Sequence, residues 1–176
     1  MHELKIPKAR IAVLIGKNGT TKKELEEYTK TKIEVDSKEG TVTLTGKDAV
    51  KLYLIRELVL AIGRGFSPDI AKLLLKQDYV MDILSLNEFS DKKKQLERVR
   101  GRVIGKKGKS REIMESLTET YISVYGKTVS IIGLAENVTM ARNAVEMLLE
   151  GATHSGVYRK LEKYRRKLKQ QRMTEF

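Results

Sequence analysis

Two short stretches of this sequence are almost identical: Ile15-Gly16-Lys17-Asn18-Gly19 and Ile104-Gly105-Lys106-Lys107-Gly108. They lie 89 residues apart, and residues that follow them also match. The matching pairs are Leu25 with Met114, Thr29 with Thr118, Ile33 with Ile122, Val35 with Val124, Val42 with Val129, Leu44 with Ile131 and Gly46 with Gly133. The last three pairs have an offset of 87, because the second copy is two residues shorter between two predicted strands. A register kept over about thirty residues predicts two copies of one domain.

Each copy has the pattern of a small α+β domain with the element order β-α-α-β-β-α. Alternating apolar and polar residues predict the strands, and apolar residues at helical spacing predict the helices. In the first copy, Thr20 or Thr21 is expected to cap the second helix, and Lys38-Glu39-Gly40 forms a hairpin turn. The expected elements are strand 3–6, helix 8–15, a helix to about Lys30, strands 32–36 and 41–45, and helix 47–62 with a buried stripe at Val50, Leu54, Leu58 and Ala61.

The second copy repeats this order behind an additional helix, which begins at Ser67-Pro68-Asp69 and runs to about Lys76. A capping serine followed by proline is a typical helix start. The other expected elements are strand 79–86, helix 92–104, helix 109–118, strands 120–125 and 128–132 on either side of Gly126-Lys127, and helix 135–149. We therefore expect two three-stranded antiparallel sheets, each with helices on one face.

The predicted domains are 1–65, 66–153 and a basic amphipathic helix at 154–176, with a linker around Gly63-Arg64-Gly65. In the last segment, apolar residues recur at helical spacing. They are Val157, Leu161, Tyr164 and Leu168. This stripe suits packing on the second domain, contact with RNA or contact with a partner protein, and a membrane-surface helix is the weakest of these options.

The charge of the chain is strongly positive and unevenly distributed. The 176 residues include 35 Lys and Arg against 23 Asp and Glu, which gives a formal net charge of +12. Residues 92–111 hold ten basic residues and one acid, and residues 151–176 hold eight basic residues and two acids. Such a surface attracts phosphates or anionic lipid.

The composition excludes several kinds of chemistry. With no cysteine there is no disulfide, thiol nucleophile or zinc knuckle, and His2 and His154 alone do not make a histidine-rich metal site. We therefore expect no metal, no cofactor and no catalytic residue. A Walker loop needs glycine where Val103 stands, and the helix face with Glu112, Glu115 and Glu119 is interpreted as a solvated surface. With no apolar run near ~20 residues and no signal peptide, we expect a cytoplasmic protein with no membrane partner.

The Gly-x-x-Gly turn between two helices is the motif that carries the chemistry. Glycine allows backbone angles that a Cβ forbids and lets the backbone come close to a ligand. The helix that starts there directs free N–H groups and its positive dipole end at the turn. With one or two lysines inside it, the turn suits a sugar-phosphate backbone, which is how the loop of a KH domain grips about four nucleotides.

Both copies resemble type I KH domains. The second copy is more specific: Gly101 to Arg111, Tyr121 to Gly133, and Met140-Ala141-Arg142 resemble archaeal members of the pre-ribosomal KH family, whose eukaryotic relatives are the Dim, Krr and Partner-of-Nob proteins. The resemblance implies binding of single-stranded RNA in the 3′ region of small-subunit ribosomal RNA during ribosome maturation. It also implies contact with the alpha subunit of translation initiation factor 2 or with a maturation nuclease.

The expected RNA-binding residues lie in and beside the two loops. They are Gly16, Lys17, Asn18, Gly19, Lys22, Arg100, Arg102, Ile104, Gly105, Lys106, Lys107, Gly108, Lys109 and Arg111. Ile15, Ile33, Ile104 and Ile122 are candidate walls of an aliphatic groove that reads bases, although ordinary core is an equal interpretation for Ile33 and Ile122. The sequence departs from the usual KH pattern in two places: cations replace an apolar residue at Lys22 and Arg111, and Lys30 and Glu119 replace the glycine that usually ends the second helix.

Three other functions remain open at this point. The first is a general RNA-binding factor in translation initiation or RNA decay. The second is a nuclease or NTPase, which RNA cleavage or ATP turnover by the pure protein would reveal. The third is a protein-docking scaffold that has lost RNA binding, against which the intact glycines and lysines of both loops argue.

Overall fold

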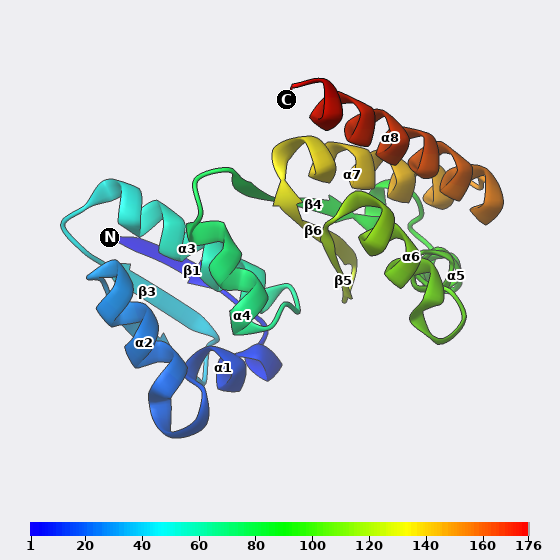
Figure 1. Ribbon diagram of the computed structural model, residues 1–176. Coiled ribbons are helices and arrows are strands. Elements are labelled where there is room, and N and C mark those ends of the chain that lie inside the picture. Colours follow the sequence, from blue (N-terminus) through cyan, green and yellow to red (C-terminus); the bar gives the residue numbers. More distant parts are fainter. Residues whose placement is uncertain (176) are drawn as a thin grey trace. The chain divides into compact units, whose positions relative to one another are not determined.

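The computed structural model describes residues 1–175. The chain divides into two compact units, Met1–Met81 and the part from Asp82 onward. Each has one three-stranded antiparallel sheet with helices on one face, and the two sheets have the corresponding strand orders β1-β3-β2 and β4-β6-β5 (Figure 1). The predicted α+β fold class is therefore confirmed.

The first unit contains the whole first repeat. Its elements are β1 (His2–Lys5), α1 (Lys8–Ile15), the 3-10 turn η1 (Lys17–Gly19), α2 (Thr20–Thr29), β2 (Lys32–Asp36), β3 (Thr41–Thr45), α3 (Ala49–Gly63), α4 (Pro68–Ala71) and the 3-10 turn η2 (Lys72–Leu75). The β2–β3 hairpin closes because the Asp36 carboxylate accepts the backbone N–H groups of Lys38 and Glu39, at 2.9 and 3.2 Å. These bounds agree with the expected elements to within one or two residues.

The second unit repeats this plan. Its sheet begins with β4, which starts just before the boundary. The elements are β4 (Tyr79–Ser85), η3 (Leu86–Glu88), α5 (Lys93–Ile104), η4 (Lys106–Gly108), α6 (Lys109–Thr118), β5 (Tyr121–Tyr125), β6 (Thr128–Leu134), α7 (Ala135–Leu149) and α8 (His154–Thr174).

The additional helix at the start of the second copy belongs to the first unit. Sequence analysis placed residues 68–75 in a domain that starts at 66, but α4 and η2 pack against α3. Ser67 caps α4 as expected, accepting the Ile70 N–H at 3.4 Å. Buried Phe66, Ala71 and Leu74 add to the core of the first unit.

The buried face of α3 differs from the predicted stripe. Leu58 and Ala61 are buried as expected, but Val50 is 68% exposed and Leu54 is half-buried. The buried residues of this helix are Leu52, Ile55, Leu58, Val59, Ala61, Ile62 and Gly63. This face is wider than an i, i+4 row because α3 packs on the sheet, on α1 and α2, and on η2.

The helix that follows each loop ends in the same way in both units. Lys30 and Glu119 adopt left-handed backbone angles (φ 55° and 54°), which is the conformation of the glycine that they replace. On either side of Lys30, the hydroxyls of Thr29 and Thr31 are buried and hydrogen-bonded to each other at 2.7 Å. In the second unit, the hydroxyls of Thr118 and Thr120 form the same bond, also at 2.7 Å. The threonine pair is thus part of the repeated helix ending.

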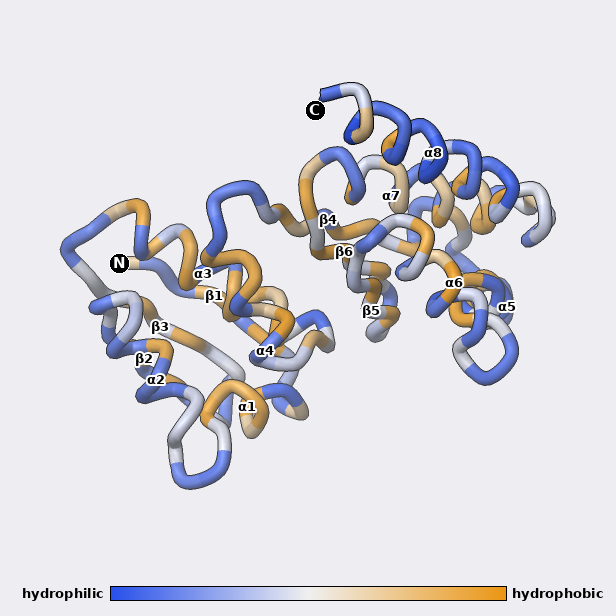
Figure 2. The backbone as a smooth tube through the Cα atoms, in the orientation of Figure 1, coloured by the Kyte–Doolittle hydropathy of each residue, from blue (hydrophilic) through white to orange (hydrophobic). Residues whose placement is uncertain are grey.

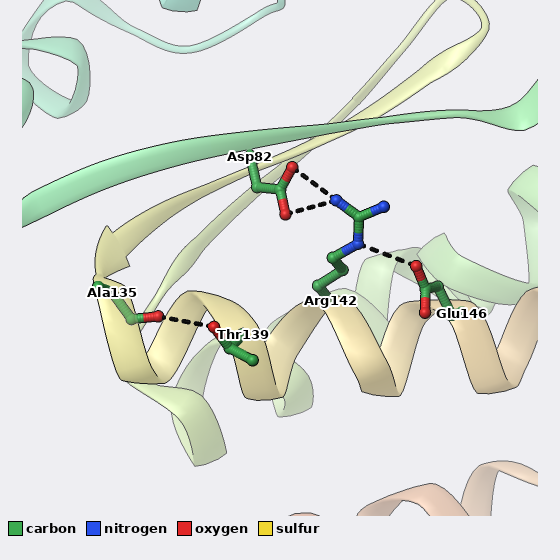
Figure 3. A network of polar contacts seen from close by, with 5 residues as sticks. All are labelled: Asp82, Ala135, Thr139, Arg142 and Glu146. Atoms are coloured by element: carbon green, nitrogen blue, oxygen red, sulfur yellow. Dashed lines mark hydrogen bonds and ion pairs between the residues drawn. The ribbon is translucent and has the colours of Figure 1, made fainter.

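Arg142 on α7 ties the helical layer of the second unit to its sheet (Figure 3). Its Nη1 atom lies 2.8 and 2.7 Å from the two carboxylate oxygens of Asp82 on β4, and its Nε atom donates to Glu146 at 2.9 Å. Both carboxylates raise the pKa of the Arg142 guanidinium, mainly through these hydrogen bonds. Sequence analysis used Arg142 only as part of a family pattern, and its role here is structural.

The C-terminal helix α8 packs on α6 and α7. Val157 and Leu161 are fully buried in the core of the second unit, and Tyr164 and Leu168 are half-buried. The predicted apolar stripe therefore serves as the packing face. Figure 2 shows the contrast with α7: most of α8 is coloured as hydrophilic.

Candidate nucleic-acid interface

The two Gly-x-x-Gly loops have the same backbone. Gly16 and Gly105 have φ of 75° and 74°, and Gly19 and Gly108 have φ of 74° and 76°. The residue before the last glycine is left-handed in both loops, with φ of 56° at Asn18 and 55° at Lys107. Thr20 and Thr21 do not act as N-caps, contrary to our expectation. The N-cap residues are Gly19 and Gly108, with no side-chain cap.

The two glycines of each loop are needed for different reasons. A Cβ on Gly105 would lie 2.5 Å from the Ser110 Cβ and 2.7 Å from the Ser110 backbone nitrogen, and a Cβ on Gly16 would meet Thr21 in the same way. The first glycine therefore lets the start of the next helix pack closely. A Cβ on Gly19 or Gly108 would meet nothing within 4 Å, so this glycine provides its positive φ and an open surface that a ligand can approach.

The loop cations are available to a ligand. Lys17, Lys106 and Lys107 are exposed, and so are Lys109 at the start of α6 and the neutral Asn18. In each unit, these side chains lie next to the N-terminal end of a ten-residue helix, α2 in the first unit and α6 in the second. Cations, a positive helix end and an unobstructed glycine are together suited to binding an anion.

Three of the expected RNA-binding cations have partners within their own unit. Arg111 donates to the Glu115 carboxylate at 2.9 Å and to the Ile122 backbone oxygen at 3.2 Å. Arg102 donates to the backbone oxygen of Ala152, between α7 and α8. Lys22 lies 3.9 Å from Glu26. The guanidinium group of Arg102 thus connects α5 to the segment between α7 and α8, and that of Arg111 connects α6 to β5. Arg100 is half-buried.

The four candidate groove isoleucines separate into two classes. Ile33 and Ile122 are 0% and 2% exposed and belong to the core. Ile15 and Ile104 are half-buried at the ends of α1 and α5, directly before the loops. Of these four, Ile15 and Ile104 are therefore the candidates for contact with a base beside the loop.

The acidic face of α6 is only partly a solvated surface. Glu112 and Glu119 are exposed, but Glu115 is half-buried. Burial raises the pKa of the Glu115 carboxyl, against the opposing effects of Arg111 and the Ile122 N–H. In the first unit, the matching Glu26 accepts the Ile33 N–H at 2.7 Å. Sequence analysis missed this anchor of the next strand, although Glu26 and Glu115 match at the offset of 89.

The described residues offer little support for another kind of site. Residues 1–175 contain no group of three or more His, Cys, Asp and Glu side chains that could hold a metal ion. No helix within this part of the chain is both long and apolar enough to cross a membrane.

Comparison with known protein families agrees with this geometry. Residues 1–60 match the model of the KH domain, and residues 80–166 match the model of the eukaryotic type KH-domain (KH-domain type I). The chain is 47% identical to a KH domain-containing protein of Methanocaldococcus jannaschii, over 96% of this chain and 76% of that protein. It is 32% identical to the pre-rRNA-processing protein PNO1 of Chaetomium thermophilum, over 91% of this chain and 64% of that protein.

Solved structures give the same result. Dim2p from Pyrococcus horikoshii has 48% identity and a TM-score of 0.86, over 92% of this chain and 98% of that one. Dim2p in a complex with a/eIF2alpha and rRNA, from the same organism, has 46% identity and a TM-score of 0.88, over 94% of both chains. A protein of unknown function from Aeropyrum pernix has 36% identity and a TM-score of 0.91, over 99% and 95%.

Fold, loops and matches define a protein with two tandem KH domains. Within that class, the chain belongs to the family of archaeal Dim2 and eukaryotic PNO1 proteins.

Proposed function

We propose that this chain is a non-catalytic protein that holds single-stranded RNA from the 3′ region of the small-subunit ribosomal RNA during ribosome maturation. The observation that carries the proposal is the pair of Gly-x-x-Gly loops with the same backbone, each between two helices and each with exposed cations. The relatives named for pre-rRNA processing and the Dim2p structure with rRNA support the choice of RNA.

The sugar-phosphate backbone contacts the loops, and bases lie beside Ile15 and Ile104. Lys17, Lys106 and Lys107 bind phosphates, Asn18 donates from its amide, and Gly16, Gly19, Gly105 and Gly108 let the RNA come close. Lys109, Lys22 and Arg100 extend the positive surface. Arg102 and Arg111 act by holding the second unit together next to the loop, since their guanidinium groups are bonded to backbone oxygens.

The alpha subunit of translation initiation factor 2 is the proposed protein partner, supported by the Dim2p complex that contains it. A maturation nuclease is the second proposed partner. We expect either partner to bind the complex of this chain with RNA.

Crosslinking of the protein to total cellular RNA, followed by mapping of the crosslinked nucleotides, tests this proposal. We expect contacts to concentrate near the 3′ end of the small-subunit rRNA and its precursor. Contacts spread over messenger RNAs would favour the general translation or decay factor. Metal-dependent RNA cleavage or ATP turnover by the pure protein would contradict the non-catalytic proposal.

A further inference from the structure

Helix α8 is attached to the second unit by one face only. Val157 and Leu161 are buried on that face, and the Tyr164 hydroxyl donates to the Asn137 side-chain oxygen at 3.3 Å. Two of the cations of α8 also point toward the unit: Arg165 donates to the Ser116 backbone oxygen at 3.2 Å, and Arg172 lies 3.6 Å from Glu119. These contacts fix which side of α8 faces away.

The opposite face of α8 is a continuous row of cations. Arg159, Lys163 and Arg166 follow one another at i, i+4 and i+7, and all three are exposed. Lys160, Lys167 and Lys169 flank the row and are also exposed. Glu162 is the one acid between residues 157 and 172. We call Arg159, Lys163 and Arg166 the outer row.

The outer row suits a phosphate backbone and does not suit bases. Tyr158 and Tyr164 are half-buried, so the outer row itself contains no aromatic ring on which a base could stack. A straight helix rises 1.5 Å per residue, so these three cations extend over about 10 Å along a fixed line. A flexible single strand is normally held by contacts to its bases as well as by charge, as proposed for Ile15 and Ile104 beside the loops. Double-stranded RNA is recognised by its shape and its phosphates.

We propose that the outer row of α8 binds the sugar-phosphate backbone of double-helical RNA, as a second RNA site in addition to the Gly-x-x-Gly loops. A protein that holds a single strand next to a duplex would then contact both parts of one RNA. This site carries no sequence preference, because phosphate contacts position a protein without reading bases. This second proposal rests on the proposed function in one respect: that function is the reason for choosing RNA as the anion that the outer row binds.

The test uses the full chain and two RNAs: a single strand, and the same single strand joined to a hairpin duplex. The test variant replaces Arg159, Lys163 and Arg166 with Gln, which keeps helix propensity. A matched control replaces Lys5, Lys47 and Lys76, three exposed lysines of the first unit, with Gln. Circular dichroism and thermal unfolding check that both variants remain folded. Truncation of α8 is unsuitable, because it would remove Val157 and Leu161 from the core.

We expect the wild-type chain to bind the hairpin-bearing RNA about tenfold more tightly than the single strand, with a steeper salt dependence. The outer-row variant should lose about this factor for the hairpin-bearing RNA and bind the single strand almost as the wild type does. The control variant should lose less on the hairpin-bearing RNA.

Three results would overturn the proposal. An equal loss on both RNAs would mean that the outer row contacts the single strand. An equal loss in the control variant would mean that net charge alone is responsible. No loss on either RNA would leave an acidic protein surface as the occupant of the outer row. If the wild-type chain failed to bind even the single strand, the proposed function would fail instead.

Discussion

The two repeats present the same loop in different electrostatic surroundings. The backbone angles of Asn18 and Lys107 agree within a few degrees, and so do those of the glycines on either side. The equivalent twenty-residue windows differ in charge: residues 3–22 hold five basic residues and one acid, and residues 92–111 hold ten basic residues and one acid. Loop shape and loop charge are thus set by different residues of the sequence.

Because loop shape and loop charge are set by different residues, the same Gly-x-x-Gly motif can have a different affinity for phosphates in each unit. The first glycine and the small residue that packs against it fix the turn, whichever side chains stand between the glycines. We expect the lysines to affect the affinity for phosphates without changing the loop, since its backbone is the same with Asn18 or Lys107 at the matching position. The second unit also has the Arg142–Asp82 contact and the docked helix α8. Because the second loop has twice as many basic residues around it, we expect the second unit to be the main RNA-binding unit of the pair.

The largest effect on stability is expected at the first glycine of each loop. Gly105→Ala should reduce the free energy of unfolding by about 2–4 kcal/mol, since the new Cβ meets Ser110 at 2.5 Å and φ is positive. Gly108→Ala should cost only about 1 kcal/mol, because its Cβ would project into open space. Denaturant unfolding measures both, and the pair Gly16→Ala and Gly19→Ala should show the same order. Equal costs within a pair would contradict the assigned packing role.

A smaller effect is expected where the two units differ. Arg142→Met should destabilise the protein by about 1–2 kcal/mol, because it leaves the partly buried Asp82 without its two-oxygen contact. Arg56→Met is the matched control on α3. The ion pair of Arg56 is with its sequence neighbour Glu57, at 2.8 Å, so this change should cost below about 0.5 kcal/mol. A double-mutant cycle with Asp82→Asn should assign most of the Arg142 loss to this contact. An equal loss for Arg56→Met would remove the distinction between the units.

Glycine at the ends of α2 and α6 should stabilise both units. Lys30 and Glu119 have positive φ, so Lys30→Gly and Glu119→Gly should each add about 0.5–1 kcal/mol to the free energy of unfolding. Thermal unfolding of the two variants measures this gain. A gain in one unit and a loss in the other would show that the two helix ends are not equivalent.

The smallest effect concerns pH. Because burial raises the pKa of Glu115, its proton is bound more tightly in the folded state than in the unfolded state. The stabilising contribution of protonated Glu115 is therefore complete below its ordinary pKa and is lost as pH rises through its folded pKa. Compared with Glu115→Gln, the wild-type chain should become slightly more stable as pH falls from about 7 to about 4. Urea unfolding across this range measures the difference, and a relative gain with rising pH would have the wrong sign.

Much of this architecture could be predicted from the sequence, because the chain contains two copies of one domain and the pattern of each copy supports the interpretation of the other. The repeat located both loops, and the spacing of apolar residues located nearly all strands and helices. The sequence does not specify which of several possible partners a side chain or segment contacts. Arg102 and Arg111 stay predicted RNA-binding residues. The structure adds the contacts of their guanidinium groups with the backbone oxygens of Ala152, 50 residues away, and Ile122, 11 residues away. Residues 68–75 could have packed on either unit, and only the tertiary contacts with α3 decide the matter.

The main claim is that the second loop is the stronger phosphate clamp, and binding of single-stranded RNA as a function of salt tests it most directly. We compare Lys106→Asp/Lys107→Asp with Lys17→Asp/Asn18→Asp. Aspartate tolerates the left-handed angles at Lys107 and Asn18, so both folds should survive. The single variants Lys106→Asp and Lys17→Asp change the net charge by the same amount, so they give a charge-matched comparison of the two loops.

If the wild-type chain contacts ~6 phosphates, its log–log salt slope should be about −4. Changes in the second loop should reduce affinity and flatten this slope more than the matched changes in the first loop. Equal losses would show two equivalent clamps, and a larger loss at the first loop would contradict the claim and move the main RNA site to residues 8–23.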